Sequence, residues 1–153
     1  MTRIFPDAKD YKTINLRISP QQRTAIEAKL GFELLPGQRD QFQYFEMTGA
    51  GGKKIGVIIA ASQKGEFGAI EFVFGLDTNM VIKDLYIQRS RERDQSFKER
   101  DFLSRFIGKR MTDAMALEKI PEADLTIGKS AVIKGLKKEL IVLQELGAWI
   151  SDN

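Results

Sequence analysis

Four successive stretches of the chain carry the hydrophobic pattern of β-strands. Their apolar residues either alternate with polar ones, which predicts a strand with one buried face, or run continuously, which is typical of a strand covered on both faces. The segments between them are short and rich in turn residues, which favours antiparallel neighbours. The sequence therefore predicts a β-meander from residues 41–47, 54–61, 69–76 and 80–88, with a further edge strand at 13–16.

Helix signals flank this meander. Ser19 stands at an N-cap position, Pro20 follows at the first helical position, and Gln22 is placed to close a capping box. Gly31 then provides a stop signal, so the pattern predicts a helix that ends there. A second apolar stripe, after the meander, predicts a helix over residues 97–107.

The longest helix signal lies near the C-terminus, in residues 126–146. Apolar residues recur there at spacings of three and four, which places them on one face of an α-helix. They are Val132, Leu136, Leu140, Leu143 and Leu146. Together these elements predict an α+β fold, with an antiparallel β-sheet meander flanked by helices and a long C-terminal helix, in a single domain over residues 1–153.

The composition is that of an ordinary globular protein and excludes several kinds of chemistry. Of 153 residues, 42% are hydrophobic and 29% charged, and the formal net charge of +3 is too small to indicate nucleic-acid binding. Cysteine and histidine are absent, which excludes disulfides, thiol or imidazole catalysis and the commonest metal ligands. We therefore identify no catalytic residue and no metal site, and we expect no nucleic-acid partner.

The sequence carries no membrane or export signal of its own. No stretch approaches the roughly 20 apolar residues of a membrane-spanning helix, so we expect no transmembrane segment. The first residues also lack the apolar core of a signal peptide. Two interpretations stay open: a cytoplasmic protein, or one whose leader has been removed.

The start of the last predicted helix, from Thr126 to Ser130, is the first candidate functional site. The first turn of a helix has backbone N–H groups without intrahelical partners at the positive end of the helix dipole, so it can bind phosphate. Lys129 adds a cation there, and Ser130 adds a hydroxyl. Gly128 to Ser130 also match the end of the phosphate-binding P-loop, but Ala123 replaces that motif's first glycine. We therefore favour a looser phosphate contact over a nucleotide triphosphatase.

A second candidate is a run of charged residues between positions 89 and 110. Eight positive residues outnumber four interleaved acidic ones. A solvated, self-paired surface is the simpler interpretation, and binding to an anionic ligand or acidic partner is the sharper one. The positive residues are Arg89, Arg91, Arg93, Lys98, Arg100, Arg105, Lys109 and Arg110.

Several segments, taken in order, carry a family resemblance. They are Ile4-Phe5-Pro6-Asp7-Ala8, Ser19-Pro20-Gln21-Gln22, Gly51-Gly52-Lys53-Lys54-Ile55-Gly56, Val73-Phe74-Gly75-Leu76-Asp77, residues 102–109 and Ser130-Ala131-Val132. In order and spacing they resemble the flavin mononucleotide (FMN)-binding domain of the Rnf complex G subunit, of the sodium-translocating quinone oxidoreductase C subunit and of smaller stand-alone relatives. The resemblance covers most of the chain and implies the same fold.

The resemblance also locates the flavin-attachment segment. In that family a hydroxyl just before the last helix carries the flavin phosphate as a phosphoester. Setting Ala131-Val132 on the family's Ala-Val places Thr126 at the first threonine of the segment and Gly128 at the acceptor position. The acceptor hydroxyl is therefore missing, and Ser130 could replace it only after a register shift of two residues. The implied flavin is bound without a covalent bond.

Further flavin-binding residues follow from the same comparison. The family's glutamate-rich ligand loop corresponds to residues 91–96, in which Glu92 is retained. We expect the backbone of residues 127–130 and Lys129 to hold the phosphate, an arginine of the loop to assist, and meander aromatics to wall the isoalloxazine ring. The predicted cofactor-binding residues are Arg91, Glu92, Arg93, Thr126, Ile127, Gly128, Lys129 and Ser130.

Three functions stay open at this stage. The first is an FMN-binding electron-transfer domain, in which the cofactor supplies the chemistry. The second is a degenerate family member without flavin that serves as a binding or assembly module of a redox complex. The third is an enzyme acting on a small anionic substrate. The resemblance further implies a redox partner protein or complex and an extracytoplasmic or periplasmic location.

Overall fold

The computed structural model describes residues 4–92, 96–98, 100–108 and 126–147. Of the positive residues in the charged run between positions 89 and 110, Arg93, Lys109 and Arg110 lie outside these ranges. The strands are β1 (Asp10–Arg17), β2 (Gln41–Thr48), β3 (Lys54–Lys64), β4 (Ala69–Asp77) and β5 (Ile82–Arg89). The helices are α1 (Pro20–Leu30), α2 (Arg100–Leu103) and α3 (Ile127–Glu145), with short 3₁₀ turns η1 (Pro36–Gln38), η2 (Ala50–Gly52) and η3 (Ser96–Lys98).

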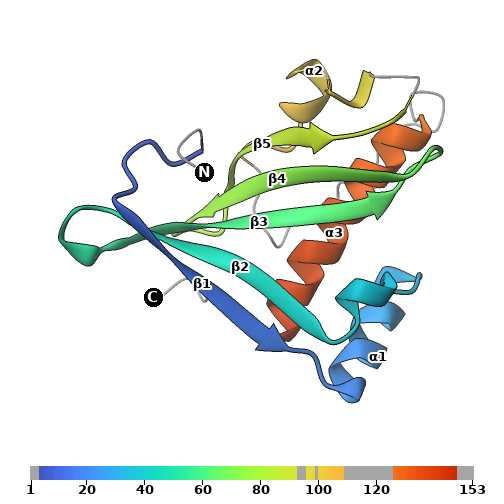
Figure 1. The fold of residues 1–153 in the computed structure, drawn as a ribbon, viewed down its shortest axis with the longest axis horizontal. Helices are drawn as coiled ribbons and strands as arrows, with labels where there is room; N and C mark the ends of the chain where they lie inside the picture. Colours follow the sequence, from blue (N-terminus) through green and yellow to red (C-terminus); the bar gives the residue numbers. More distant parts are fainter. Residues whose placement is uncertain (1–3, 93–95, 99, 109–125, 148–153) are drawn as a thin grey trace.

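The strands form one antiparallel sheet in the order β1-β2-β3-β4-β5. Each strand pairs with its neighbour in sequence, as short turn-rich connections require. The helix α3 lies along one face of the sheet, and α1 packs beside it (Figure 1). This arrangement confirms the predicted α+β class, the meander and the long C-terminal helix, and β1 is the predicted edge strand in a longer form.

The ends of α1 are those that the sequence predicts. The Gln22 backbone N–H donates to Ser19 Oγ (3.1 Å), and the Ser19 backbone N–H donates to Gln22 Oε1 (2.9 Å), which closes the capping box. Gly31 ends the helix at φ +79°, a conformation that favours glycine because it has no Cβ. Local sequence therefore determines both ends of this helix.

The middle of the sheet is covered on both faces. On the side of α3, Phe72 and Phe74 of β4 are fully buried in the main core, in the alternation that the sequence predicts. On the other side, Phe5 of the N-terminal segment packs with Ile58 of β3 and Val73 of β4 in a second, smaller cluster. The continuous apolar run in β3 is explained by this double coverage.

The sheet splits between β2 and β3. These strands pair only from Phe45↔Ile58 to Thr48↔Lys54, with an irregular register after Met47. Toward the other end of the pair, β2 stays with β1 and β3 stays with β4. Figure 1 shows the two strands diverging there, with α3 passing behind the gap. The split matters for the chemistry of α3, because it opens the sheet over that helix.

The helix predicted over residues 97–107 is shorter in the structure. α2 ends at Leu103, and the chain continues in tight turns in which the Phe106 N–H donates to the Leu103 carbonyl oxygen (3.1 Å). The predicted apolar stripe is nevertheless buried, because Phe102 and Phe106 meet edge to face with ring centroids 5.2 Å apart. Burial of the stripe therefore does not require a continuous helix.

Candidate functional site

The first turn of α3 begins where the sequence predicts. Thr126 is the N-cap: its Oγ1 accepts a hydrogen bond from the Lys129 backbone N–H (3.1 Å), and its carbonyl oxygen accepts one from Ser130 N–H (2.9 Å). The side chain of Ile127, next in the chain, is 53% exposed. The Thr126 hydroxyl therefore satisfies one of the N–H groups that would otherwise be available to an anion.

Gly128 packs directly against an aromatic ring. A Cβ built on Gly128 would lie 2.4 Å from Cδ1 of Phe97, whose side chain is fully buried. No larger residue fits there unless the ring moves. Close packing is thus a sufficient reason for glycine at the position where the family resemblance expects a hydroxyl.

The side chains of Lys129 and Ser130 face different neighbours. The Lys129 ammonium lies 5.5 Å from the centroid of the Phe102 ring, within cation–π range. Ser130 lines a cavity of about 320 Å³ between α3 and the end of α1, near Gly31 and Lys134. The structure therefore brings the predicted backbone positions together but points these two side chains apart.

The Glu92 carboxylate binds a turn of the protein itself. It is 7% exposed and accepts hydrogen bonds from the backbone N–H groups of Glu66 (2.5 Å) and Phe67 (2.8 Å), in the turn between β3 and β4. The absence of a side chain at Gly65 makes room for it, since a Cβ there would lie 2.3 Å from Glu92 Oε1. Arg91 is exposed, and Arg93 lies outside the described residues.

The described members of the predicted cofactor-binding set lie at one end of the molecule. Lys138 of α3 contacts Ser62 of β3, and the helix runs from there toward the β3–β4 turn as its numbering decreases. The first turn of α3, the β3–β4 turn and the end of β5 consequently share this end (Figure 1). Among the described residues, this end carries the cations Lys64, Arg89, Arg91 and Lys129 and the exposed apolar side chains of Phe67 and Ile127.

Restoring a hydroxyl at Gly128 tests this packing. Gly128→Thr is expected to lower the free energy of unfolding by about 1–3 kcal/mol, because the new Cβ overpacks the Phe97 ring. Urea unfolding monitored by circular dichroism measures the change. Gly37→Thr is the matched control, since Gly37 has open space around it. In a Phe97→Ala background the cost of Gly128→Thr should largely vanish; an unchanged cost would contradict the packing explanation.

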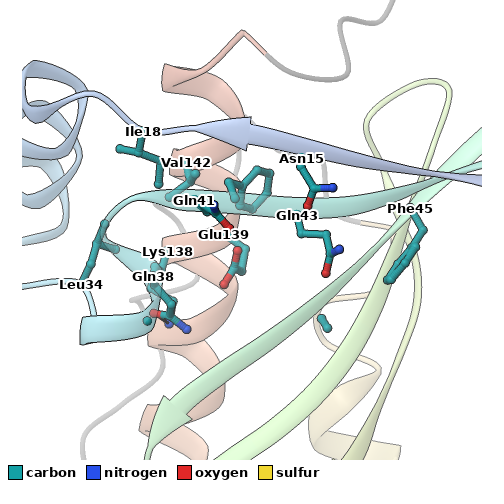
Figure 2. Close-up of a pocket in the computed structure, with 13 residues that line it drawn as sticks. Asn15, Ile18, Leu34, Gln38, Gln41, Gln43, Phe45, Lys138, Glu139 and Val142 are labelled. Carbon is teal, nitrogen blue, oxygen red and sulfur yellow. Dashed lines mark hydrogen bonds between the residues drawn. The ribbon is translucent and has the colours of Figure 1, made fainter.

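A second site, which sequence reasoning missed, lies under the split in the sheet. A cavity of about 300 Å³ separates β2 from β3, and α3 forms its floor (Figure 2). Lys138 is 1% exposed there and donates to three oxygens: Gln38 Oε1 (2.7 Å), the Ser62 carbonyl (2.6 Å) and Gln63 Oε1 (2.9 Å). Burial lowers the pKa of Lys138, and the neighbouring Glu139 carboxylate opposes that effect.

Glu139 extends from α3 into this cavity. It is 6% exposed, and among the described residues none donates a hydrogen bond to its carboxylate. Burial raises its pKa from 4.5 to about 7, against the opposing effect of the Lys138 ammonium. In the sequence, Lys137-Lys138-Glu139 resembles a solvated helix face. The available signal was its place beside the apolar stripe, since Glu139 lies three positions after Leu136 and four before Leu143.

Neither a metal centre nor a membrane helix emerges from the described part of the chain. It contains no group of three or more histidine, cysteine, aspartate or glutamate residues placed to hold a metal ion. None of its helices is long and apolar enough to span a membrane.

Comparison with known proteins identifies a fold relative. No protein-family model matches the chain, and no curated protein matches it significantly. The crystal structure of NqrC from Shewanella oneidensis is similar to it, with a TM-score of 0.53 and 13% sequence identity over 95% of this chain and 88% of that chain. The chain therefore shares its fold with NqrC along nearly its whole length.

Proposed function

We propose that this chain is an FMN-binding electron-transfer domain that holds its flavin without a covalent bond. The observation that supports this most is the fold shared with NqrC over nearly the whole chain, since NqrC is a C subunit of the kind that the sequence resembles. A sequence identity of 13% supports a common fold, and flavin binding is what we propose beyond it. We also propose that the chain works with a redox complex and that it lies outside the cytoplasm.

The end of the molecule where α3 begins offers the chemistry that an FMN needs. The Lys129 ammonium and the first-turn backbone N–H groups that Thr126 does not bond favour a phosphate, and Arg91 adds an exposed cation. Phe67 and Ile127 offer exposed apolar surface to an isoalloxazine ring. Because Gly128 has no hydroxyl, this chain would bind the phosphate by charge and hydrogen bonds alone. The flavin would supply the electron transfer.

The absorption spectrum of the full chain purified from its native host tests this proposal. We expect flavin bands that move entirely to the supernatant on acid precipitation. Lys129→Ala should weaken FMN binding by about 1–2 kcal/mol, roughly tenfold in dissociation constant, because a charge-assisted contact to the phosphate is lost. Lys134→Ala is the matched control: that lysine lies on the same helix, beside the ring of Phe32.

Two results would reject non-covalent FMN. One is colour that stays with the precipitated chain, which would indicate a covalent bond. The other is a colourless protein whose thermal unfolding does not respond to added FMN.

The second candidate is a flavin-free binding or assembly module with the same fold. Specific contacts favour it: the Glu92 carboxylate is bonded to the β3–β4 turn, and the Phe97 ring covers Gly128. Both predicted ligand positions therefore already have partners within the protein. In this case the colourless protein without an FMN response is the expected result, and co-purification with redox proteins from the native host becomes the measurement.

A further inference from the structure

The cavity between β2 and β3 is distinct from the flavin site proposed above. Glu139 follows Lys129 by ten residues, which corresponds to about 15 Å along the helix axis. The cavity exists because the strands part beyond the Phe45↔Ile58 pair, which leaves the facing backbone edge of β3 without a strand partner. The side chains of Gln38 (3.1 Å) and Lys138 (2.6 Å) donate to the Ser62 carbonyl oxygen on that edge instead.

All hydrogen-bond donors of the Lys138 ammonium are engaged in this arrangement. An ammonium has three N–H donors, and the three acceptors of Lys138 are neutral oxygens of Gln38, Ser62 and Gln63. It therefore has no donor left for an anion that enters the cavity. Its role is structural, because it gives the Ser62 carbonyl oxygen of β3 a hydrogen bond that a paired strand would otherwise supply.

Glu139, in contrast, accepts no hydrogen bond from the described residues. The residue as a whole is more than nine-tenths buried, its carboxylate faces the cavity, and no described residue donates a hydrogen bond to it. Among the described residues, the Glu139 oxygens are not fully buried unpaired atoms, so they reach the open cavity, where water or a ligand supplies the donor that the protein does not. The group that the cavity lacks is therefore a hydrogen-bond donor, and a positively charged donor suits an ionised carboxylate best.

The rest of the lining is neutral. Asn15, Gln41 and Gln43 from β1 and β2 contribute amides, and apolar side chains such as Ile18 and Val142 contribute the remainder (Figure 2). Among the described residues that line the cavity, Lys138 is the one titratable group besides Glu139. The lining thus holds one carboxylate, neutral amides and one ammonium, Lys138, whose three donors are already bonded. One carboxylate suits a monovalent organic cation better than a divalent metal ion, which needs several anionic ligands.

We infer that this cavity binds a small organic cation, a protonated amine or guanidinium compound, whose charged group pairs with the Glu139 carboxylate and hydrogen-bonds to the surrounding amides. A volume of about 300 Å³ lies at the lower end of ligand sites, which fits a small metabolite.

The experiment compares three probes of equal chain length: n-butylamine, n-butanol and n-butyrate. Saturation-transfer NMR and thermal unfolding of the full chain at pH 8 are the readouts. We expect binding of n-butylamine and none of the other two, because they differ from it mainly in charge. Affinity should fall by about tenfold or more between pH 8 and pH 5.5, since protonation of Glu139 removes the anion that the ligand needs.

Variants assign the binding to the cavity. Glu139→Gln keeps the shape of the side chain and should weaken n-butylamine binding by about tenfold or more. Glu145→Gln, on the same helix and paired with Lys29, should leave it unchanged. Gln43→Ala, at an exposed position of β2, should weaken binding without endangering the fold.

Several outcomes would overturn the inference. They are no binding of n-butylamine at pH 8, equal binding of n-butanol, and equal affinity in Glu139→Gln and the unsubstituted protein. Preferential binding of Ca²⁺ over n-butylamine would replace the organic cation by a metal.

Discussion

Truncation of Phe5 to alanine is expected to lower the free energy of unfolding by about 3–5 kcal/mol, a large part of the total stability of a domain of this size. Phe5 is 1% exposed although it lies almost at the N-terminus. Its ring fills the space above two glycines of the sheet: a Cβ on Gly56 would lie 2.3 Å from Phe5 Cζ, and one on Gly75 would lie 2.8 Å from Cε2.

We expect this large loss of stability because no neighbouring side chain can fill the space that the Phe5 ring occupies. The two glycines leave a hollow in the far face of the sheet, and the removal of the ring would leave a cavity that their backbone cannot fill. The ring also lies under the Lys83 ammonium, 4.7 Å from its centroid. The loss thus combines buried apolar area, packing and a cation–π contact.

Urea unfolding of Phe5→Ala gives the change in free energy. Phe67→Ala is the matched control, since the same substitution is made on a side chain that is 42% exposed, and we expect a change within about 0.5 kcal/mol. If Phe5→Ala changed stability no more than the control, the N-terminal segment would not cover the sheet in solution.

Stability should also fall as the pH rises from about 4.5 to 7, because of Glu139. Its pKa is near 7 in the folded protein and 4.5 as its ordinary value, so the folded state binds the proton more tightly than the unfolded state. The stabilisation from this group is therefore fully present below pH 4.5 and lost as the pH passes through 7. The shift corresponds to about 3 kcal/mol.

The Glu139→Gln variant isolates this contribution from other titrating groups. The difference in unfolding free energy between the variant and the unsubstituted protein should grow in favour of the variant from pH 4.5 to 8. Glu145→Gln, whose carboxylate pairs with Lys29 near the surface, is the control and should show no such growth. Parallel pH profiles for the Glu139→Gln variant and the unsubstituted protein would mean that Glu139 is solvated.

The candidate sites differ in how far sequence could predict them. The first turn of α3 was predictable, because its cap is built from residues three positions apart, Thr126 and Lys129. The role of Glu92 was not, since its partners Glu66 and Phe67 lie 25 or more positions earlier. Family resemblance predicts a ligand residue there, and the structure adds a contact that no local pattern contains.

Local physics explains what the sequence determined by itself. The strands follow from residue periodicity, the ends of α1 from Ser19, Gln22 and Gly31, and the α+β class from the order of the elements. Each of these signals involves residues within one turn or one strand, so no distant contact is needed to read it.

Tertiary structure alone decided the cavity in the sheet and the packing of the N-terminal segment on it. The strands β2 and β3 split because their pairing stops at Phe45. At the split, Lys138 hydrogen-bonds to residues 75 to 100 positions earlier in the chain. The coverage of the sheet by Phe5 likewise depends on distant glycines. Such contacts form because the folded chain excludes water from both faces of the middle of the sheet. Burial against that sheet also decides whether Glu139 is a solvated charge or a buried one.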